Sequence, residues 1–294
     1  MGKALADKLP ICKSVFEEAD RALGMRLASL CFEGPDEELR LTANTQPAIL
    51  TTCTAALRAL EAAGVKADFV AGHSLGEYSA LVAAGCLKFE DALRVVRQRG
   101  LFMQEAVPAG EGAMAAVTGC DIELVDSVCR EAAVLGVCGP ANINSPNQIV
   151  IAGHRAAVER AVELAKAAGA RRTVMLAVSA PFHCELMKPA AERLGPVLAS
   201  IEFRDLKVPL VTNVDASVVT AGAQAKDALI RQVASPVRWS DSIRLLIDNG
   251  VTTFLEVGPG KVLAGLIKQI DRASQVFSVA DPDSLDATVA SLQL

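Results

Sequence analysis

A short apolar strand runs directly into a helix at the segment DFVAGHSLG, residues 68–76. Its last five residues fit the G-x-S-x-G nucleophile elbow, in which a serine lies on a sharp strand-to-helix turn. Glycines two residues to either side of Ser74 let the backbone fold tightly enough to lift the serine oxygen out of the sheet. The serine then lies at a helix N-terminus, where free N–H groups favour negative charge. We therefore predict that Ser74 is a nucleophile and that the N–H of Leu75 stabilises the oxyanion, the alternative being an ordinary strand-turn-helix corner.

Helix and strand patterns alternate along most of the chain on both sides of this segment. A helix is expected over 46–63, opening at Thr45-Gln46-Pro47 with a cap-like threonine and a proline in its first turn. Further helices are expected at 75–84, 90–106, 184–200, 224–234 and 239–249, and strands at 208–212 and 253–257. A closing helix is expected after the last strand. The alternation predicts an α/β fold, with a large α/β-hydrolase-like domain on a mainly parallel sheet. The functional site is expected where loops leave the strand ends.

The middle third of the chain has a different order of elements. Strands are expected at 113–117, 137–143, 148–152 and 172–178, and helices at 121–133 and 154–168. This β-α-β-β-α-β order is that of the ferredoxin-like split unit. We therefore predict a small ferredoxin-like domain at 110–180, inserted into a large domain formed by 1–109 and 181–294.

The overall composition excludes several classes of protein. Hydrophobic residues make up 51% of the 294 positions and charged residues 21%, so the chain can bury a large core and is not globally disordered. The 29 basic and 34 acidic residues give a net charge of −5, which excludes a strongly basic nucleic-acid footprint. The start has no secretory pattern and no run of 18 apolar residues occurs, so a soluble, cytoplasmic protein is expected.

No segment of the sequence predicts a metal or nucleotide cofactor. The eight cysteines are at least nine residues apart, so the chain has no C-x-x-C and no zinc-type pairing. Several lie in apolar helical runs, as Cys53 does, and buried reduced thiols are expected. The segment GPGK at 258–261 lacks the spacing of a phosphate loop, which favours a tight strand-to-helix turn.

Only three histidines are available to activate a serine hydroxyl as a general base. His73 adjoins the nucleophile, but neighbouring residues on a tight turn point in different directions, so we expect it to pack locally. His154 opens a helix of the small domain and is expected to be a cap or a surface residue. His183 lies where the chain returns to the large domain, and elimination makes it the base. No carboxylate is singled out as a third member, since neither Asp121 nor Asp126 is well placed for it.

Arg99 lies on the helix that follows the elbow helix and has two interpretations. With Arg94 and Arg97 it would form an exposed basic face, which the spacing alone favours. If it turns inward, its guanidinium would hold a carboxylate bidentately beside the serine. The substrate would then be a dicarboxylic acyl group.

Four segments together carry a resemblance to one family. GHSLGEYSAL at 72–81 resembles the signature of the malonyl-CoA:acyl carrier protein transacylases of bacterial fatty-acid synthesis. RGLFMQ at 99–104, NINSP at 142–146 and EVGPGK at 256–261 match the same family. The match covers essentially the whole chain. Acyltransferase domains of polyketide synthases, which have a related fold, share the serine motif.

The resemblance implies a role for each residue that matches a functional position of the family. Ser74 would be the nucleophile and His183 the base, oriented by the main-chain carbonyl of Gln232 in place of an acid. Arg99 would bind the substrate carboxylate, which replaces the exposed-face interpretation. Phe182 is similar to the residue of malonyl-selective members, where bulk disfavours a 2-methyl group, although bacterial stand-alone enzymes more often carry serine there.

The largest departure from the family lies at the start of the chain. The family opens with a strand and a Phe-Pro-Gly-Gln-Gly-Ser-Gln loop, and MGK at residues 1–3 aligns with the end of that loop. We therefore expect the chain to lack the first strand and the glutamine N–H that serves as second oxyanion donor. Loss of one such donor typically lowers the rate by about 10²–10³.

These features predict ping-pong transfer of a malonyl group from malonyl-CoA to the phosphopantetheine thiol of acyl carrier protein, through a malonyl-Ser74 ester. No cofactor is implied, because malonyl-CoA is a substrate. The carrier protein is acidic and needs a basic patch, for which Arg171, Arg172 and Lys166 are candidates. We expect a monomer with no nucleic-acid or membrane partner.

Three alternatives stay open at the level of sequence. A serine hydrolase or esterase would share the elbow but let water deacylate the enzyme. Another acyltransferase would take a methylmalonyl or acetyl group. A weakly active, shortened chain would retain only carrier-protein binding.

Overall fold

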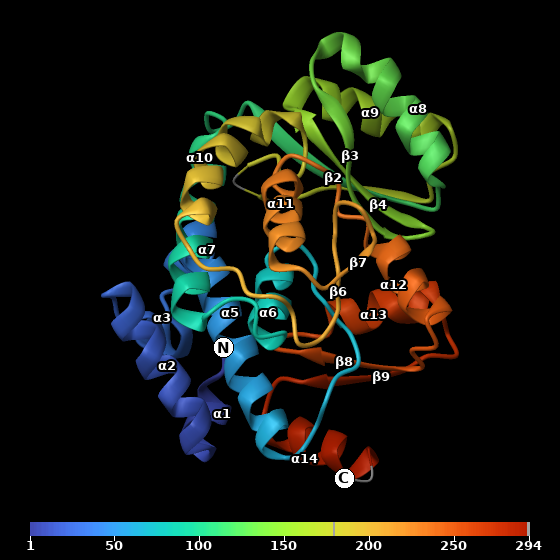
Figure 1. Ribbon diagram of the computed structural model, residues 1–294. Helices are drawn as coiled ribbons and strands as arrows, with labels where there is room; N and C mark the ends of the chain where they lie inside the picture. Colours follow the sequence, from blue (N-terminus) through green and yellow to red (C-terminus); the bar gives the residue numbers. More distant parts are fainter. Residues whose placement is uncertain (179, 293–294) are drawn as a thin grey trace.

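The nucleophile elbow joins strand β1 (Val70–Ala71) to helix α6 (Gly76–Ala83) in the computed structural model (Figure 1). The structure describes residues 1–178 and 180–292. A methyl group at Gly72 would lie 2.0 Å from the main-chain carbon and oxygen of the glycine four residues later. No side chain fits in that space, so the corner requires glycine at residue 72, as the motif predicts, whereas a methyl group at Gly76 would meet nothing within 4 Å.

The strands around the elbow form two small sheets. One sheet has the order β1-β6-β7 and the other pairs β8 with β9. The β1–β6 and β8–β9 pairs are parallel, whereas β6 and β7 are antiparallel. The bounds are β6 Leu210–Val211, β7 Val218–Val219, β8 Thr253–Val257 and β9 Gln275–Val279. The predicted parallel pairing is confirmed, but the strands at the elbow are shorter than expected and do not join one continuous sheet.

The end of the chain contains a strand and a helix that the sequence interpretation missed. A single closing helix was expected, but α13 (Val262–Ile270) is followed by β9 and then by α14 (Pro282–Ser291). Helix α14 has a clear start signal, a capping box. The Asp281 side chain accepts from the Ser284 N–H at 2.8 Å, and the Ser284 hydroxyl accepts from the Asp281 N–H at 3.0 Å.

The middle of the chain forms a four-stranded antiparallel sheet with two helices, drawn in green in Figure 1. The strand order is β3-β4-β2-β5, which is the ferredoxin-like arrangement that the β-α-β-β-α-β pattern predicts. The bounds are β2 Gly112–Thr118, α8 Ile122–Ala132, β3 Cys138–Ser145, β4 Gln148–His154, α9 Arg155–Ala167 and β5 Arg172–Met175. The division of the chain at residues 110 and 180 stays a prediction, and Ser179 lies outside the described residues.

The two faces of this sheet have different partners. One face packs on α8 and α9, with Ile149 and Ile151 of β4 in that core. The other face, through Met114, packs on Cys184 and Phe182. These two residues flank His183, so the small sheet holds the segment on which the predicted base lies.

A layer of helices packs against the elbow helix and forms the main core. Helices α5 (Thr42–Ala62) and α7 (Phe89–Glu105) approach closely, since a methyl group at Gly100 would lie 2.7 Å from the Ala43 Cα. Helix α5 starts at Thr42, so the predicted start at residue 45 is wrong. The packing of its first turn on α7 holds that turn helical, and Pro47 lies inside the helix at the cost of one hydrogen bond.

The remaining helices connect these parts. Their bounds are α1 Lys3–Lys8, α2 Pro10–Leu23, α3 Leu27–Glu33, α4 Asp36–Leu39, α10 Lys188–Ala199, α11 Gly222–Gln232 and α12 Trp239–Asp248, with 3-10 turns at Ala133–Leu135 and Glu185–Met187. The helix expected at 184–200 is thus a 3-10 turn followed by α10. Within residues 1–178 and 180–292, no helix is both long and apolar enough to cross a membrane.

Candidate active site

The backbone of the elbow is held in a conformation that few residues adopt. Ser74 has φ = 53°, in the left-handed region where side chains other than glycine are uncommon. The Asn213 side chain braces the turn from both sides: its Oδ1 accepts from the Ser74 N–H at 2.6 Å, and its Nδ2 donates to the Gly72 carbonyl at 2.7 Å. Asn213 is fully buried, so these bonds are shielded from competing water. The strain at Ser74 is therefore supported from a segment far away in sequence.

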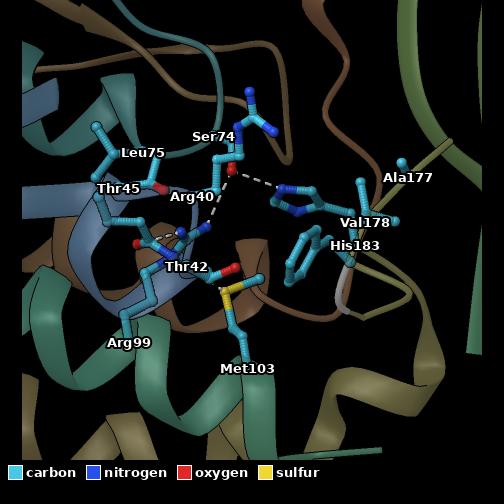
Figure 2. Close-up of a pocket in the computed structure, with 12 residues that line it drawn as sticks. Arg40, Thr42, Thr45, Ser74, Leu75, Arg99, Met103, Ala177, Val178 and His183 are labelled. Atoms are coloured by element: carbon cyan, nitrogen blue, oxygen red, sulfur yellow. Dashed lines mark hydrogen bonds between the residues drawn. The ribbon is translucent and has the colours of Figure 1, made fainter. Parts of the chain in front are cut away.

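Ser74 and His183 form a hydrogen-bonded pair. The Ser74 Oγ lies 2.7 Å from His183 Nε2, and His183 Nδ1 lies 2.9 Å from the main-chain oxygen of Gln232 (Figure 2 shows the first contact). Because a carbonyl only accepts, Nδ1 carries the proton, which leaves Nε2 free to accept the serine proton. Burial, followed by the positive charge of Arg99, lowers the pKa of His183 to about 3. The imidazole is therefore neutral near pH 7, the form that a base requires.

The partner of His183 is a helix end instead of a carboxylate. Gln232 is the last residue of α11, and the final carbonyls of a helix have no partner inside it. The negative end of the helix also stabilises the imidazolium that forms when His183 takes a proton. This geometry explains why the sequence shows no acid in a suitable place. Asp121, one of the two carboxylates weighed for that role, instead caps α8 by accepting from Leu124 N–H at 2.9 Å.

Arg99 points into the site and not to solvent. It is 1% exposed, so the exposed-face interpretation is wrong for this residue. Its Nη2 donates to the Ser74 Oγ at 3.1 Å and to the Gln232 side-chain oxygen at 2.9 Å, and its Nη1 donates to Gln46 Oε1 at 2.8 Å. All three acceptors are neutral oxygens. A buried positive charge thus lies beside Ser74, where it would attract a negatively charged substrate group.

These side chains open onto one cavity of about 410 Å³. Figure 2 shows Ser74, Arg99 and His183 converging on it from three different segments. Phe182 lines the cavity next to His183, and Leu75 lines it at the N-terminus of α6. The structure therefore brings together all six residues that the sequence and the resemblance single out, and their catalytic roles stay predictions.

The other two histidines have the local roles predicted for them. The His73 ring donates from Nε2 to Asn144 Oδ1 at 2.9 Å and packs on the Trp239 ring, with 5.7 Å between centroids. His154 is the N-cap residue of α9, and its Nδ1 accepts from the Val137 N–H at 2.9 Å. Elimination and the geometry therefore point to the same candidate base, His183.

The GPGK segment forms a turn and not a phosphate site. The Glu256 carboxylate accepts from the N–H groups of Leu263 and Ala264 at 3.0 and 2.8 Å, so a negative charge already caps α13. A bound phosphate would be repelled there. Among the described residues, no three His, Cys, Asp or Glu side chains cluster as metal ligands would. All eight cysteines are free thiols.

Three buried polar residues that hydrogen-bond within the site were missed at the level of sequence. Gln46, Glu77 and Asn213 are each buried and each bond a candidate catalytic residue or its support. A usable signal exists for Glu77, the one charged residue of the short, mostly apolar helix α6. Asn213 directly follows the predicted strand at 208–212, where functional side chains are expected.

Comparisons with known proteins agree with this geometry. The model of the family described as "acyl transferase domain" matches residues 1–282. The malonyl CoA-acyl carrier protein transacylase of Bacillus subtilis is 52% identical, with 100% of this chain and 93% of that protein covered. The Escherichia coli K12 protein of the same name is 49% identical, with 97% and 93% covered.

Two solved structures show the same fold. The malonyl CoA-acyl carrier protein transacylase of Coxiella burnetii has a TM-score of 0.98 at 44% identity, covering 100% of this chain and 93% of the other. A type II PKS acyl-carrier protein in complex with its malonyl-transacylase has a TM-score of 0.97 at 46% identity, covering 99% and 94%. The predicted fold class is therefore confirmed.

Proposed function

The chain belongs to the acyl transferase domain family, and from this premise we propose that it transfers a malonyl group from malonyl-CoA to the phosphopantetheine thiol of acyl carrier protein, supplying fatty-acid elongation. The observation that carries the proposal is the buried Arg99 guanidinium, 3.1 Å from the nucleophile oxygen. A cation that forms no ion pair with the described residues suits, in that place, an acyl group that ends in a carboxylate, as malonyl does. An acetyl group or a simple ester offers nothing to pair with it.

The first half-reaction acylates the enzyme. Ser74 Oγ attacks the thioester carbonyl carbon while His183 Nε2 takes its proton, and the Leu75 N–H donates to the developing oxyanion. The carbon–sulfur bond then breaks, and His183 returns the proton to the CoA sulfur. The products are a malonyl ester of Ser74 and free CoA. Throughout, Gln232 O holds the imidazole in the tautomer that accepts at Nε2.

The second half-reaction reverses these steps with a different thiol. The carrier protein's phosphopantetheine thiol gives its proton to His183 and attacks the ester carbonyl, and the Leu75 N–H again donates to the oxyanion. Cleavage of the ester bond returns the proton to Ser74 and releases the malonyl thioester. Phe182, which lines the cavity beside His183, fills space that a 2-methyl group would need, and we assign it the selection against methylmalonyl.

A basic groove suits the docking of an acidic carrier protein. A hollow of about 530 Å³ is lined by Arg171 and Arg172, which are named as candidates for this role in the sequence analysis. Lys268 of α13 and Arg272, which follows α13, line the same hollow. Every charged residue that lines the groove is basic, although the chain as a whole carries −5. Lys166 is not among the lining residues. We assign the groove to the carrier protein, because local charge and not net charge steers association.

Intact-mass measurement tests the transfer directly. Incubation with malonyl-CoA should add one malonyl group to the protein, and Ser74→Ala should prevent it. Holo acyl carrier protein should discharge the adduct and become malonylated. A folded wild-type protein that forms no adduct would show that the proposed function is wrong, whereas discharge by water at the same rate as by carrier protein would identify a hydrolase.

Three further features stay predictions. The reaction as written needs no cofactor besides its two substrates. We place it in the cytoplasm. We also expect the protein to act as a monomer, since one chain supplies every residue used in the two half-reactions.

A further inference from the structure

Glu77 is a buried carboxylate that the two half-reactions do not use. It lies three residues after the nucleophile, in the first turn of α6, and is 0% exposed. Its Oε2 accepts from the Gln232 side-chain Nε2 at 2.8 Å and from the Asn213 main-chain N–H at 3.1 Å. Its other oxygen is buried without a hydrogen-bond partner among the described residues. A carboxylate in such a place is costly, so a structural or functional gain must offset it.

The hydrogen bonds that Gln232 Nε2 donates, one of them to Glu77, determine how the Gln232 amide is turned. Gln232 Nε2 donates to Glu77 and to the Ser74 carbonyl, the latter at 3.0 Å, which leaves Oε1 facing Arg99 Nη2 at 2.9 Å. An amide turned the other way would place its NH₂ against the guanidinium, donor against donor. Glu77 disfavours that rotamer because its carboxylate would lose a donor and face an oxygen. The orientation of the amide therefore decides whether Arg99 has an acceptor.

We propose that Glu77 is a positioning residue that turns the Gln232 amide and so places the Arg99 guanidinium for a malonyl carboxylate. This inference rests on the proposed function and adds to it the residue that orients the selectivity arginine. Glu77 does not touch the reacting atoms. It acts through Gln232, which thereby serves twice: its main-chain oxygen orients His183 and its side chain orients Arg99.

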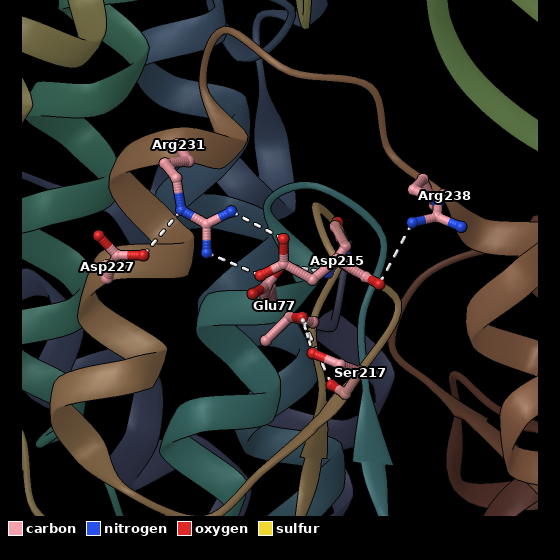
Figure 3. Close-up of polar contacts among 8 residues, drawn as sticks. Glu77, Asp215, Ser217, Asp227, Arg231 and Arg238 are labelled. Carbon is pink, nitrogen blue, oxygen red and sulfur yellow. Dashed lines mark hydrogen bonds and ion pairs between the residues drawn. The ribbon is translucent and has the colours of Figure 1, made fainter.

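The surroundings of Glu77 keep its two donors in place. Asn213 and Asp215 lie on the loop after β6, and Arg231 precedes Gln232 on α11. Figure 3 shows the Arg231 guanidinium clamped to the Asp215 carboxylate just above Glu77, with contacts of 2.7 and 2.8 Å. This ion pair joins the loop after β6 to the end of α11. It therefore fixes the positions of the two donors to Glu77, the Asn213 N–H and Gln232 Nε2, relative to each other.

The role that we assign to Glu77 needs an oxygen acceptor and not a negative charge. Burial raises the pKa of Glu77 to about 7, and the negative charge of Asp215 adds to this, while Gln232 and Arg99 act in the opposite sense. A carboxyl group in either protonation state, or a side-chain amide, offers an oxygen to the two donors. Glu77→Gln should therefore preserve the arrangement, and Glu77→Ala should weaken it by removing one of the acceptors of Gln232 Nε2.

The test compares two acyl donors on each variant. Arg99 contacts the carboxylate of malonyl-CoA, and the acetyl group of acetyl-CoA has no carboxylate. Misplacing Arg99 should therefore lower the acylation of Ser74 by malonyl-CoA much more than its acylation by acetyl-CoA. We expect Glu77→Ala to lower the malonyl-to-acetyl ratio of kcat/KM about tenfold or more, which is the loss of one charge-assisted hydrogen bond. Glu77→Gln should keep the ratio within about threefold of wild type. The ratio is independent of how much of the protein is folded, so a merely structural defect would not move it.

Glu256→Ala is the matched control, because Glu256 also accepts two N–H bonds but caps α13 instead of touching the site. It should lower stability and leave the ratio unchanged. An unchanged ratio in Glu77→Ala would overturn the inference while the proposed function stands. A ratio that falls equally in Glu77→Gln would overturn it in favour of a counter-charge. A wild-type protein that accepts no malonyl group at all would overturn the proposed function and this inference together.

Discussion

Replacing Arg99 by glutamine should raise the pKa of the base. Arg99 Nη2 and His183 Nε2 both lie against the Ser74 Oγ, at 3.1 and 2.7 Å. The two nitrogens are therefore within about 6 Å, where two positive charges repel by about 3 kcal/mol at an effective dielectric constant of about 20. The repulsion disfavours the imidazolium, in agreement with the lowering of the pKa of His183 by burial and then by Arg99.

The sign of the effect follows from which form of His183 is active. The neutral imidazole accepts the serine proton, so activity is lost as the pH falls through its pKa. Arg99 lowers that pKa, and the wild-type protein therefore keeps its base at lower pH. Without the guanidinium, about 3 kcal/mol of repulsion disappears. The acid limb of the pH profile of activity, where activity is lost at low pH, should then move up by about two pH units.

The assay is the pH dependence of kcat/KM for p-nitrophenyl acetate, a neutral acyl donor that does not need Arg99 as a carboxylate partner. The profile of kcat/KM reports groups of the free enzyme. Because burial raises the pKa of Glu77 to about 7, the comparison is repeated in the Glu77→Gln background, which removes that second titrating group. His73, the other ionisable side chain that acts on His183, is unchanged in both.

Arg97→Gln is the control for the Arg99 variant. It removes the same charge from the same helix, but Arg97 bonds Asn44 and Met25 outside the site. Its acid limb should coincide with that of wild type. If the acid limb of Arg99→Gln also coincides with wild type, or lies at lower pH, the guanidinium does not act on His183 and the electrostatic reasoning fails.

The remaining predictions concern packing and docking. Gly100→Ala places a methyl group 2.7 Å from main-chain atoms of α5, which cannot move aside. Denaturant unfolding should therefore show a free energy of unfolding lowered by about 1–3 kcal/mol. Gly265→Ala lies in an exposed part of α13 with nothing within 4 Å, so it should instead raise the free energy of unfolding by about 0.5–1 kcal/mol. Equal effects at both sites would refute the close contact between α5 and α7. Arg172→Glu should raise the KM for acyl carrier protein about threefold or more at low salt, and added salt should reduce the difference. Arg130→Glu, on α8 outside the groove, should leave that KM unchanged, and an equal effect of both reversals would exclude the groove as the docking site.

Local patterns predicted the longer elements between residues 46 and 257 in the right order, but they gave no element before residue 45, missed β7, β9 and α14, and predicted the lengths of the elements poorly. The alternation of apolar runs correctly indicated the ferredoxin-like unit, because each strand and helix there is long enough to show its own period. The strand before Ser74 has only two paired residues, since pairing depends on a partner strand about 140 positions away that no local pattern describes. The early start of α5 likewise depends on its contact with α7 at Gly100.

The position of the candidate nucleophile could be predicted from sequence alone because the geometry of its turn is local. A serine between two glycines at a strand-to-helix corner is shaped by residues within a few positions, and a count of three histidines left one candidate base. The inward direction of Arg99 could not be predicted from its spacing, which alone favours an exposed face. Only the tertiary structure turns it inward, where packing of α7 on α5 buries the guanidinium against Gln46 and Ser74. The supports from Asn213 and Gln232 are likewise tertiary, since a hydrogen bond across more than 130 residues depends on how helices and sheets pack.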